Sequence, residues 1–142
     1  GVFVERSAQV GLVDRGDGKG LVAVDYDRDG DEDLLVVNAA GPPRLFRNEG
    51  APANGWLDVR LAGAAGNTRG IGAKVTVTSC DRTIVRTVSA SSTFLATPEA
   101  VAHVGLGPGV STVERVEVRW PDGRVEQRVD VPAGSSLRWS RP

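Results

Sequence analysis

Apolar and polar residues alternate along several short segments of the chain, with a period of two residues. Residues 56–61 show this pattern, and so do residues 73–78 and 116–120. The pattern is typical of β-strands that have one buried face and one exposed face. Helical periodicity is nearly absent, so we expect each of these strands to pack its apolar face against a second sheet.

Turn-forming residues separate these segments. Residues 79–82 (Ser-Cys-Asp-Arg) predict a short hairpin, and so do residues 121–123 (Pro-Asp-Gly), which combine a fixed φ, a self-capping side chain and a residue tolerant of positive φ. Earlier in the chain, residues 21–24 and 34–37 are continuously apolar, which predicts strands buried on both faces. Strands at such short spacing predict an all-β fold, with an antiparallel sandwich or barrel in its second part.

Residues 48–55 (Asn-Glu-Gly-Ala-Pro-Ala-Asn-Gly) have the composition of a linker. We therefore predict a domain boundary in this stretch, with one unit in residues 1–54 and another in residues 55–142. The composition is compatible with two small packed units, because 40% of the residues are hydrophobic.

The candidate chemistry lies in residues 25–33 (Asp-Tyr-Asp-Arg-Asp-Gly-Asp-Glu-Asp), which hold six of the 18 acidic side chains. Carboxylates a few ångströms apart repel one another and raise each other's pKa unless a cation neutralises them. Ca2+ is suited to this task, because it binds about six to eight oxygen atoms. Gly30 should supply the sharp turn of the loop, and Asp31 a carbonyl ligand. We predict a Ca2+ site with five aspartates: Asp25, Asp27, Asp29, Asp31 and Asp33.

Other metal sites fit these residues less well. An EF-hand loop begins with the same spacing, but it requires a glutamate at its twelfth position, and counting from Asp25 that position holds Val36. Mg2+ is disfavoured because it takes fewer protein ligands and keeps its waters. Zn2+ is disfavoured because no histidine or cysteine is near in sequence.

Residues 20–38 (Gly-Leu-Val-Ala-Val-Asp-Tyr-Asp-Arg-Asp-Gly-Asp-Glu-Asp-Leu-Leu-Val-Val-Asn) resemble an FG-GAP/VCBS repeat, the calcium-bearing blade unit of integrin-α-type β-propellers. Residues 45–48 (Leu-Phe-Arg-Asn) match the end of that unit. Residues 3–12 are similar to its lead-in in the cartilage acidic protein family.

The remainder resembles the ASPIC/UnbV domain, on the residues Trp56-Leu57, 69–75 (Arg-Gly-Ile-Gly-Ala-Lys-Val), 105–107 (Gly-Leu-Gly) and 116–123 (Val-Glu-Val-Arg-Trp-Pro-Asp-Gly). Residues 89–97 depart from this family, which usually has a Gly-Ser-aromatic segment there. A partner contact made by this segment would therefore differ in this protein.

The resemblance implies a propeller-blade-like calcium-binding unit in residues 1–54 and an ASPIC/UnbV-like β domain in residues 55–142. It also implies an extracellular or cell-envelope location, Ca2+ binding at the five aspartates, an adhesion or matrix context and no known reaction. One blade leaves strand edges exposed, so we expect these edges to be covered by the second domain, another copy of the chain or upstream repeats. Because the chain begins with glycine, we expect it to be processed or cut from something larger. The ASPIC/UnbV domain sits C-terminal to such repeats, so the resemblance implies the C-terminal part of a larger exported protein.

Charge and hydropathy narrow the choice of partners. The formal net charge is −1 and no long basic run occurs, so a nucleic-acid partner has no electrostatic support. No apolar run approaches the length of about 18 residues that crosses a bilayer, so we expect no membrane insertion. The single cysteine, Cys80, cannot form an internal disulfide and is expected to be a small structural residue.

Catalytic patterns are weak, and we predict that the chain is not an enzyme. His103 is the single histidine and lies in an apolar segment, so we expect a structural role for it. Ser89, Ser91 and Ser92 could supply a hydroxyl nucleophile, but no nucleophile-elbow spacing is present.

Two alternatives to a non-enzymatic binding or structural module remain open. One is an accessory or catalytic domain of a secreted hydrolase, which would need a pocket that holds His103 beside a serine and a carboxylate. The other is a carbohydrate-binding module whose exposed aromatic residues would be Trp56, Trp120, Trp139 and Tyr26. The partner of the module, an unknown protein or glycan, does not follow from the sequence.

Overall fold

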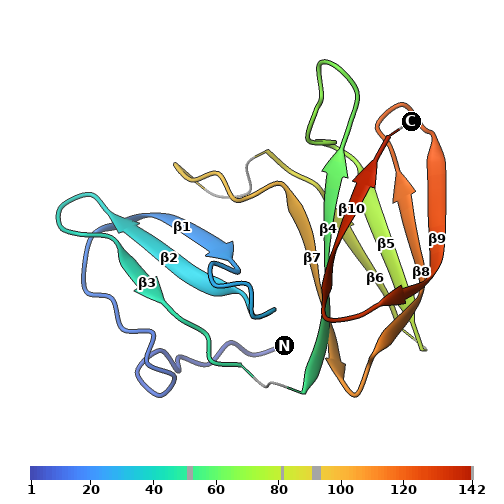
Figure 1. The fold of residues 1–142 in the computed structure, drawn as a ribbon. Coiled ribbons are helices and arrows are strands. Elements are labelled where there is room, and N and C mark those ends of the chain that lie inside the picture. Colours follow the sequence, from blue (N-terminus) through green and yellow to red (C-terminus); the bar gives the residue numbers. More distant parts are fainter. Residues whose placement is uncertain (51–52, 81, 91–93, 142) are drawn as a thin grey trace.

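The computed structural model describes residues 1–50, 53–80, 82–90 and 94–141, and every regular element in these ranges is a β-strand. The strands form three sheets. Figure 1 shows the smallest sheet lying beside a two-layered sandwich built by the rest of the chain. The predicted all-β class is confirmed. None of the described segments is a helix long and apolar enough to cross a membrane.

The small sheet consists of three antiparallel strands in the order β1-β2-β3. Their bounds are Gly18–Val24 for β1, Asp33–Asn38 for β2 and Arg44–Phe46 for β3. Val24 at the end of β1 is paired with Asp33 at the start of β2. The acidic loop is therefore the connection between these two strands.

The prediction that residues 21–24 and 34–37 are buried on both faces is wrong, although both segments do form strands. Leu21 of β1 is 46% exposed and Val37 of β2 is 44% exposed. On β3, Leu45 is also 46% exposed. In the strand register Val37 and Leu45 lie on one face of the sheet and Leu21 lies on the other, so the described part of the chain leaves neither face fully buried.

Two sheets form the sandwich. The first has the order β10-β4-β7, with bounds Asn54–Ala62 for β4, Val101–Pro108 for β7 and Ser135–Ser140 for β10. β7 runs antiparallel to β4, whereas β10 runs parallel to it. The second sheet is antiparallel in the order β6-β5-β8-β9, with bounds Lys74–Ser79 for β5, Arg82–Thr87 for β6, Thr112–Arg119 for β8 and Val125–Pro132 for β9.

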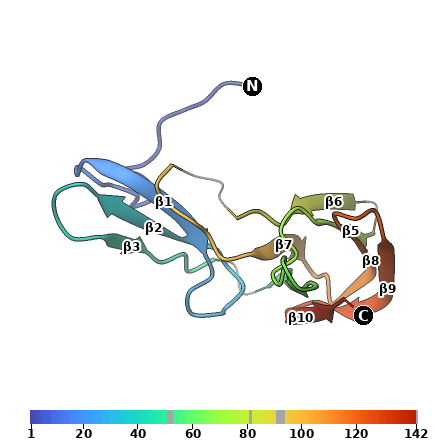
Figure 2. The ribbon, with the colours of Figure 1, turned by 90° about the horizontal axis from the view of Figure 1, so that it is seen from above.

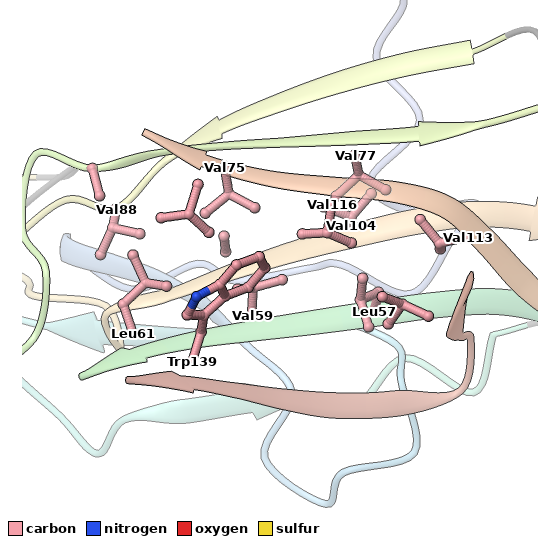
Figure 3. Close-up of a cluster of buried hydrophobic side chains, with 14 of the residues drawn as sticks. Leu57, Val59, Leu61, Val75, Val77, Val88, Val104, Val113, Val116 and Trp139 are labelled. Atoms are coloured by element: carbon pink, nitrogen blue, oxygen red, sulfur yellow. The ribbon is translucent and has the colours of Figure 1, made fainter. Parts of the chain in front are cut away.

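The core lies between these two sheets, and the period-two predictions for it are confirmed. Figure 3 shows the inward side chains of both layers meeting in the space between them. The members from the three predicted strands are all buried: Leu57, Val59, Leu61, Ala73, Val75, Val77, Val116, Val118 and Trp120. Burying a side chain of this kind stabilises the fold by about 1.5–3 kcal/mol, so this layer is the main stabilising interaction of the sandwich.

Both predicted hairpins are present. The amide of Gly123 donates to the carbonyl of Trp120 at 2.9 Å, and this turn connects β8 to β9. In the other hairpin, Ser79 of β5 pairs with Arg82 of β6. Asp81 of that turn lies outside the described residues.

Two tryptophans belong to the core rather than to an exposed platform. Trp120 is 2% exposed and Trp139 is 3% exposed. Their indole nitrogens donate to the two carboxylate oxygens of Glu126, at 2.9 and 3.0 Å, which satisfies both buried donors. These two residues are therefore unavailable for stacking against a sugar.

Candidate functional site

Three of the five predicted ligands come together in the loop between β1 and β2. One carboxylate oxygen each of Asp25, Asp27 and Asp29 lies within 4.8 Å of the other two. The Asp25 carboxylate accepts hydrogen bonds from the backbone amides of Asp29, at 3.2 Å, and Gly30, at 3.0 Å. These bonds curl the loop back over the end of β1, which is the local geometry that aspartate side chains favour in turns.

The other two predicted ligands lie outside this group of three carboxylates. Asp33 is fully buried, and its carboxylate accepts hydrogen bonds from the amides of Tyr26, at 3.1 Å, and Asn48, at 2.8 Å. Its carboxylate thus links the acidic loop to the segment after β3. Asp31 donates its amide to the Asp29 carboxylate at 3.0 Å. Metal ligation by any of the five aspartates stays a prediction.

Arg47 is the cation that the described residues place beside the loop. Its Nε lies 2.8 Å from the Asp27 carboxylate, and one terminal nitrogen lies 3.8 Å from the Asp29 carboxylate. The charge of Asp27, followed by that of Glu49, raises the pKa of the Arg47 guanidinium above its ordinary value. Arg47 thus offsets part of the negative charge of the loop.

The geometry of the three carboxylates is compatible with a single Ca2+ ion. Protein oxygen ligands lie about 2.3–2.6 Å from Ca2+, so two ligands on opposite sides of the ion are about 4.6–5.2 Å apart. The separations among Asp25, Asp27 and Asp29 fall inside this limit. Carboxylates are also the hard donors that Ca2+ prefers. The donor set therefore fits the ion.

The acidic loop also packs against the first strand of the sandwich. A Cβ atom placed on Gly30 would lie 2.0 Å from Nε1 of Trp56, and Gly30 has a φ of +100°. Only glycine is compatible with both conditions. Trp56 in β4 thus contacts the loop directly, and any change in loop conformation should change the environment of this indole.

A second group of charged residues lies on the outer face of β4 and β7, where these strands face the small sheet. Asp58 and His103 are direct cross-strand partners, and Nδ1 of His103 lies 2.9 Å from the Asp58 carboxylate. Asp58 is only 5% exposed. Its second oxygen lies 3.5 Å from Arg60, which also pairs with Glu99.

This pair borders a cavity of about 300 Å³ between the small sheet and the sandwich. β1 lines one side, and the outer face of β4 and β7 lines the other. Figure 2 shows the chain that leads into β7 extending toward β1, and Gly20 of β1 lies against Ala96 of this segment. The cavity is therefore walled by both units.

The Asp58 carboxylate raises the pKa of His103 through its hydrogen bond. Partial burial of the ring opposes this rise, and the negative charges of Glu32 and Asp25 in the acidic loop add to it. His103 is thus held by a carboxylate of its own sheet and is also influenced by the acidic loop.

The cavity partly meets the requirement of the hydrolase alternative, because Ser89 lines it together with His103 and Asp58. A catalytic triad also requires a hydrogen bond between the serine hydroxyl and the second imidazole nitrogen. The described hydrogen bond of the His103 ring is the one that Nδ1 makes with Asp58. Ser91 and Ser92 lie outside the described residues.

Sequence patterns did not identify Asp58, Arg47 or Asn48 as parts of this region. The alternation in residues 56–61 indicates only that Asp58 lies on the polar face of its strand, because its partnership with His103 depends on the register of β4 against β7. Arg47 and Asn48 are close to the acidic loop only after β3 has paired with β2. The Leu-Phe-Arg-Asn ending of the predicted repeat was the one available signal for these two residues.

These features define an all-β protein in which a β-sandwich carries an additional small sheet with an acidic loop. The family model "ASPIC and UnbV" matches residues 63–142. The chain therefore belongs to the ASPIC and UnbV family. The matched region begins after β4, which is the central strand of its sheet. The start of the match therefore does not mark a domain boundary, and the predicted division at residues 54 and 55 stays a prediction.

Similar curated proteins extend the relationship upstream. The chain is 36% identical over 121 residues to cartilage acidic protein 1 of Mus musculus and to that of Homo sapiens, in each case covering 82% of the chain and 18% of the relative. It is 32% identical over 117 residues to the Xenopus tropicalis protein of the same name. Coverage of 82% cannot fit within residues 63–142, so the similarity includes part of the region before residue 63. The chain spans less than a fifth of the length of these relatives.

Substitution of Gly30 tests the contact between the loop and the sandwich. Gly30→Ala should lower the free energy of unfolding by about 1–3 kcal/mol and change the tryptophan fluorescence of the protein, because the new methyl group overlaps the Trp56 indole and the backbone has positive φ. The matched control is Gly41→Ala in the connection between β2 and β3, where φ is +114° but no atom lies within 4 Å of the added Cβ. Equal destabilisation by the two variants would show that backbone strain alone accounts for the effect.

The His103–Asp58 pair predicts a pH-dependent contribution to stability. Because folding raises the pKa of His103, the pair stabilises the fold fully below the unfolded value of about 6.5, and this contribution is lost as the pH rises through the folded pKa. Asp58→Asn should lower the folded pKa, as measured by NMR titration of the single histidine in chelator. Asp122→Asn, which removes a partner of Arg141 instead, is the control. An unchanged His103 titration in Asp58→Asn would contradict the assignment.

Proposed function

We propose that this chain is a calcium-binding, non-enzymatic extracellular module used for binding or assembly. The observation that carries the proposal is the convergence of the Asp25, Asp27 and Asp29 carboxylates within a distance that one ion can span. Ca2+, when bound, would supply the positive charge that Arg47 supplies only in part. It would hold the loop between β1 and β2 in one conformation and so stabilise the small sheet.

We further propose that the small sheet is one FG-GAP/VCBS-type repeat of a longer protein. Its three-stranded antiparallel form and the acidic loop between its first two strands are compatible with part of a propeller blade. The exposed Val37 and Leu45, which lie on one face of the sheet, support this idea, because a neighbouring repeat or another copy of the chain would cover them. The similarity to cartilage acidic protein 1 before residue 63 also supports it.

An extracellular location agrees with the proposed metal site. Extracellular calcium modules bind with dissociation constants of about 10⁻⁴–10⁻³ M, which suits a loop that supplies a few partly exposed carboxylates. The similar proteins are named for cartilage. An adhesion or matrix role with an unidentified protein or glycan partner follows as part of the proposal.

The two alternatives have less support. The hydrolase alternative has an oriented histidine in a cavity, but its support ends with the hydrogen bond between His103 and Asp58. The carbohydrate alternative has less support because Trp120 and Trp139 are buried in the core and cannot stack against a sugar. Trp56 is partly buried against Gly30, and Tyr26, at 50% exposure, is the remaining exposed member of the predicted platform.

Calcium should stabilise the protein in a way that depends on the loop. With dissociation constants of about 10⁻⁴–10⁻³ M, about 10 mM Ca2+ should raise the free energy of unfolding by about 1.4–2.7 kcal/mol relative to chelator. Asp27→Ala or Asp29→Ala should abolish this difference. Thermal melting followed by tryptophan fluorescence measures it, because one of the three tryptophans, Trp56, contacts the loop.

Asp17→Asn is the matched control, because Asp17 is an exposed aspartate beside the same sheet that pairs with Lys19. This variant should retain the full response to Ca2+. Identical melting curves in chelator and in millimolar Ca2+ would refute the proposal for the unmodified chain.

A further inference from the structure

The cavity between the small sheet and the sandwich shares Asp25 with the group of three carboxylates but extends beyond that group, and its walls are of two kinds. Apolar side chains of β1, together with Leu34 and Val101, line much of it. The charged residues come from four separate parts of the chain: the acidic loop, β4, the segment before β7, and β7. With a volume of about 300 Å³, it is at the lower end of the range of about 300–1,000 Å³ for small-molecule pockets.

The charged groups of the cavity are unequally engaged. Arg60 uses all three of its nitrogens, with Ser136 at 3.2 Å from Nε, with Glu99, and with Asp58. His103 uses Nδ1 for Asp58. The donor groups on this wall are thus largely taken by the protein itself.

The acceptors are not all taken. The Glu32 carboxylate has no hydrogen-bond or ion-pair partner within the described part of the chain. Glu99 contributes only Oε1 to its pair with Arg60. The formal charge of the lining is also negative without Asp25, which belongs to the group of three carboxylates, because Glu32, Asp58 and Glu99 outnumber Arg60 and His103. The open hydrogen-bonding capacity of the cavity is therefore that of an acceptor with excess negative charge.

From this combination we infer that the cavity binds one basic side chain, arginine or lysine, of a polypeptide partner. The apolar wall of β1 matches the methylene stem of such a side chain, and the Glu32 and Glu99 carboxylates match its charged end. A negatively charged cleft with apolar walls also concentrates cations by its electrostatic field. The small volume favours a single side chain over a longer ligand such as an oligosaccharide.

This inference goes beyond calcium binding, because Glu32 and Glu99 are not members of the group of three carboxylates. The probe is arginine with acetylated amino and amidated carboxyl ends, which mimics the residue within a chain. It is added to the ¹⁵N-labelled protein at low salt and in millimolar Ca2+. Saturable shifts are expected at the amides of Ala102, His103 and Val22. The equally blocked citrulline, which has the same shape without the charge, should produce none.

Two variants locate the interaction. Glu32→Gln should weaken the affinity by about fivefold, the upper range for a partly exposed ion pair, and Glu99→Gln should also weaken it. Glu114→Gln is the control, because Glu114 lies on β8 and caps the amide of Cys80 instead. Unchanged spectra away from the cavity verify that each variant is folded.

The inference is overturned by any of three results. Absence of saturable shifts at millimolar probe would exclude the site, and equal binding of citrulline would exclude charge recognition. If the shifts appear in chelator but vanish in Ca2+, the metal occupies the cavity. A peptide of glycine and serine with one central arginine should shift the same amides with at least equal affinity. Failure of that peptide to bind would exclude a polypeptide partner.

Discussion

The crowding of like charges in the loop between β1 and β2 is the constraint on which the rest of the small sheet depends. Three carboxylates lie within 4.8 Å of one another, an arrangement that is unfavourable unless hydrogen bonds and positive charge compensate for it. The backbone amides of Asp29 and Gly30 bind Asp25, and Arg47 pairs with Asp27. A divalent cation would complete this compensation, because one guanidinium balances only one of the three charges.

The loop contacts both units of the protein. The buried Asp33 ties it to Asn48, in the segment that follows β3. Gly30 lies against Trp56 in β4, and the charges of the loop act on His103 across the cavity. An ion bound in the loop would therefore also order the contact between the small sheet and the sandwich, because Gly30, which makes this contact, belongs to the same loop.

The sequence predicted the sandwich better than the small sheet, for a physical reason. Side chains in a strand alternate with a fixed period, so the inward residues of β4, β5 and β8 followed directly from the pattern. The continuous apolar run of residues 21–24 is ambiguous, because it has the same form whether a strand is buried on both faces or awaits a partner. The pairing of Asp58 with His103 could not be predicted, because local patterns do not encode the register between strands 45 residues apart. The spacing of the five aspartates could not show that Asp33 is buried and accepts hydrogen bonds from the amides of Tyr26 and Asn48.

A crystal structure of the chain grown in millimolar Ca2+, with anomalous diffraction data that locate calcium, tests the central claim most directly. The account predicts an anomalous peak within about 2.3–2.6 Å of oxygens from Asp25, Asp27 and Asp29. It also predicts that Gly30 stays packed against Trp56. Carboxylates turned outward into solvent, with no peak between them and Arg47 still paired with Asp27, would contradict the account.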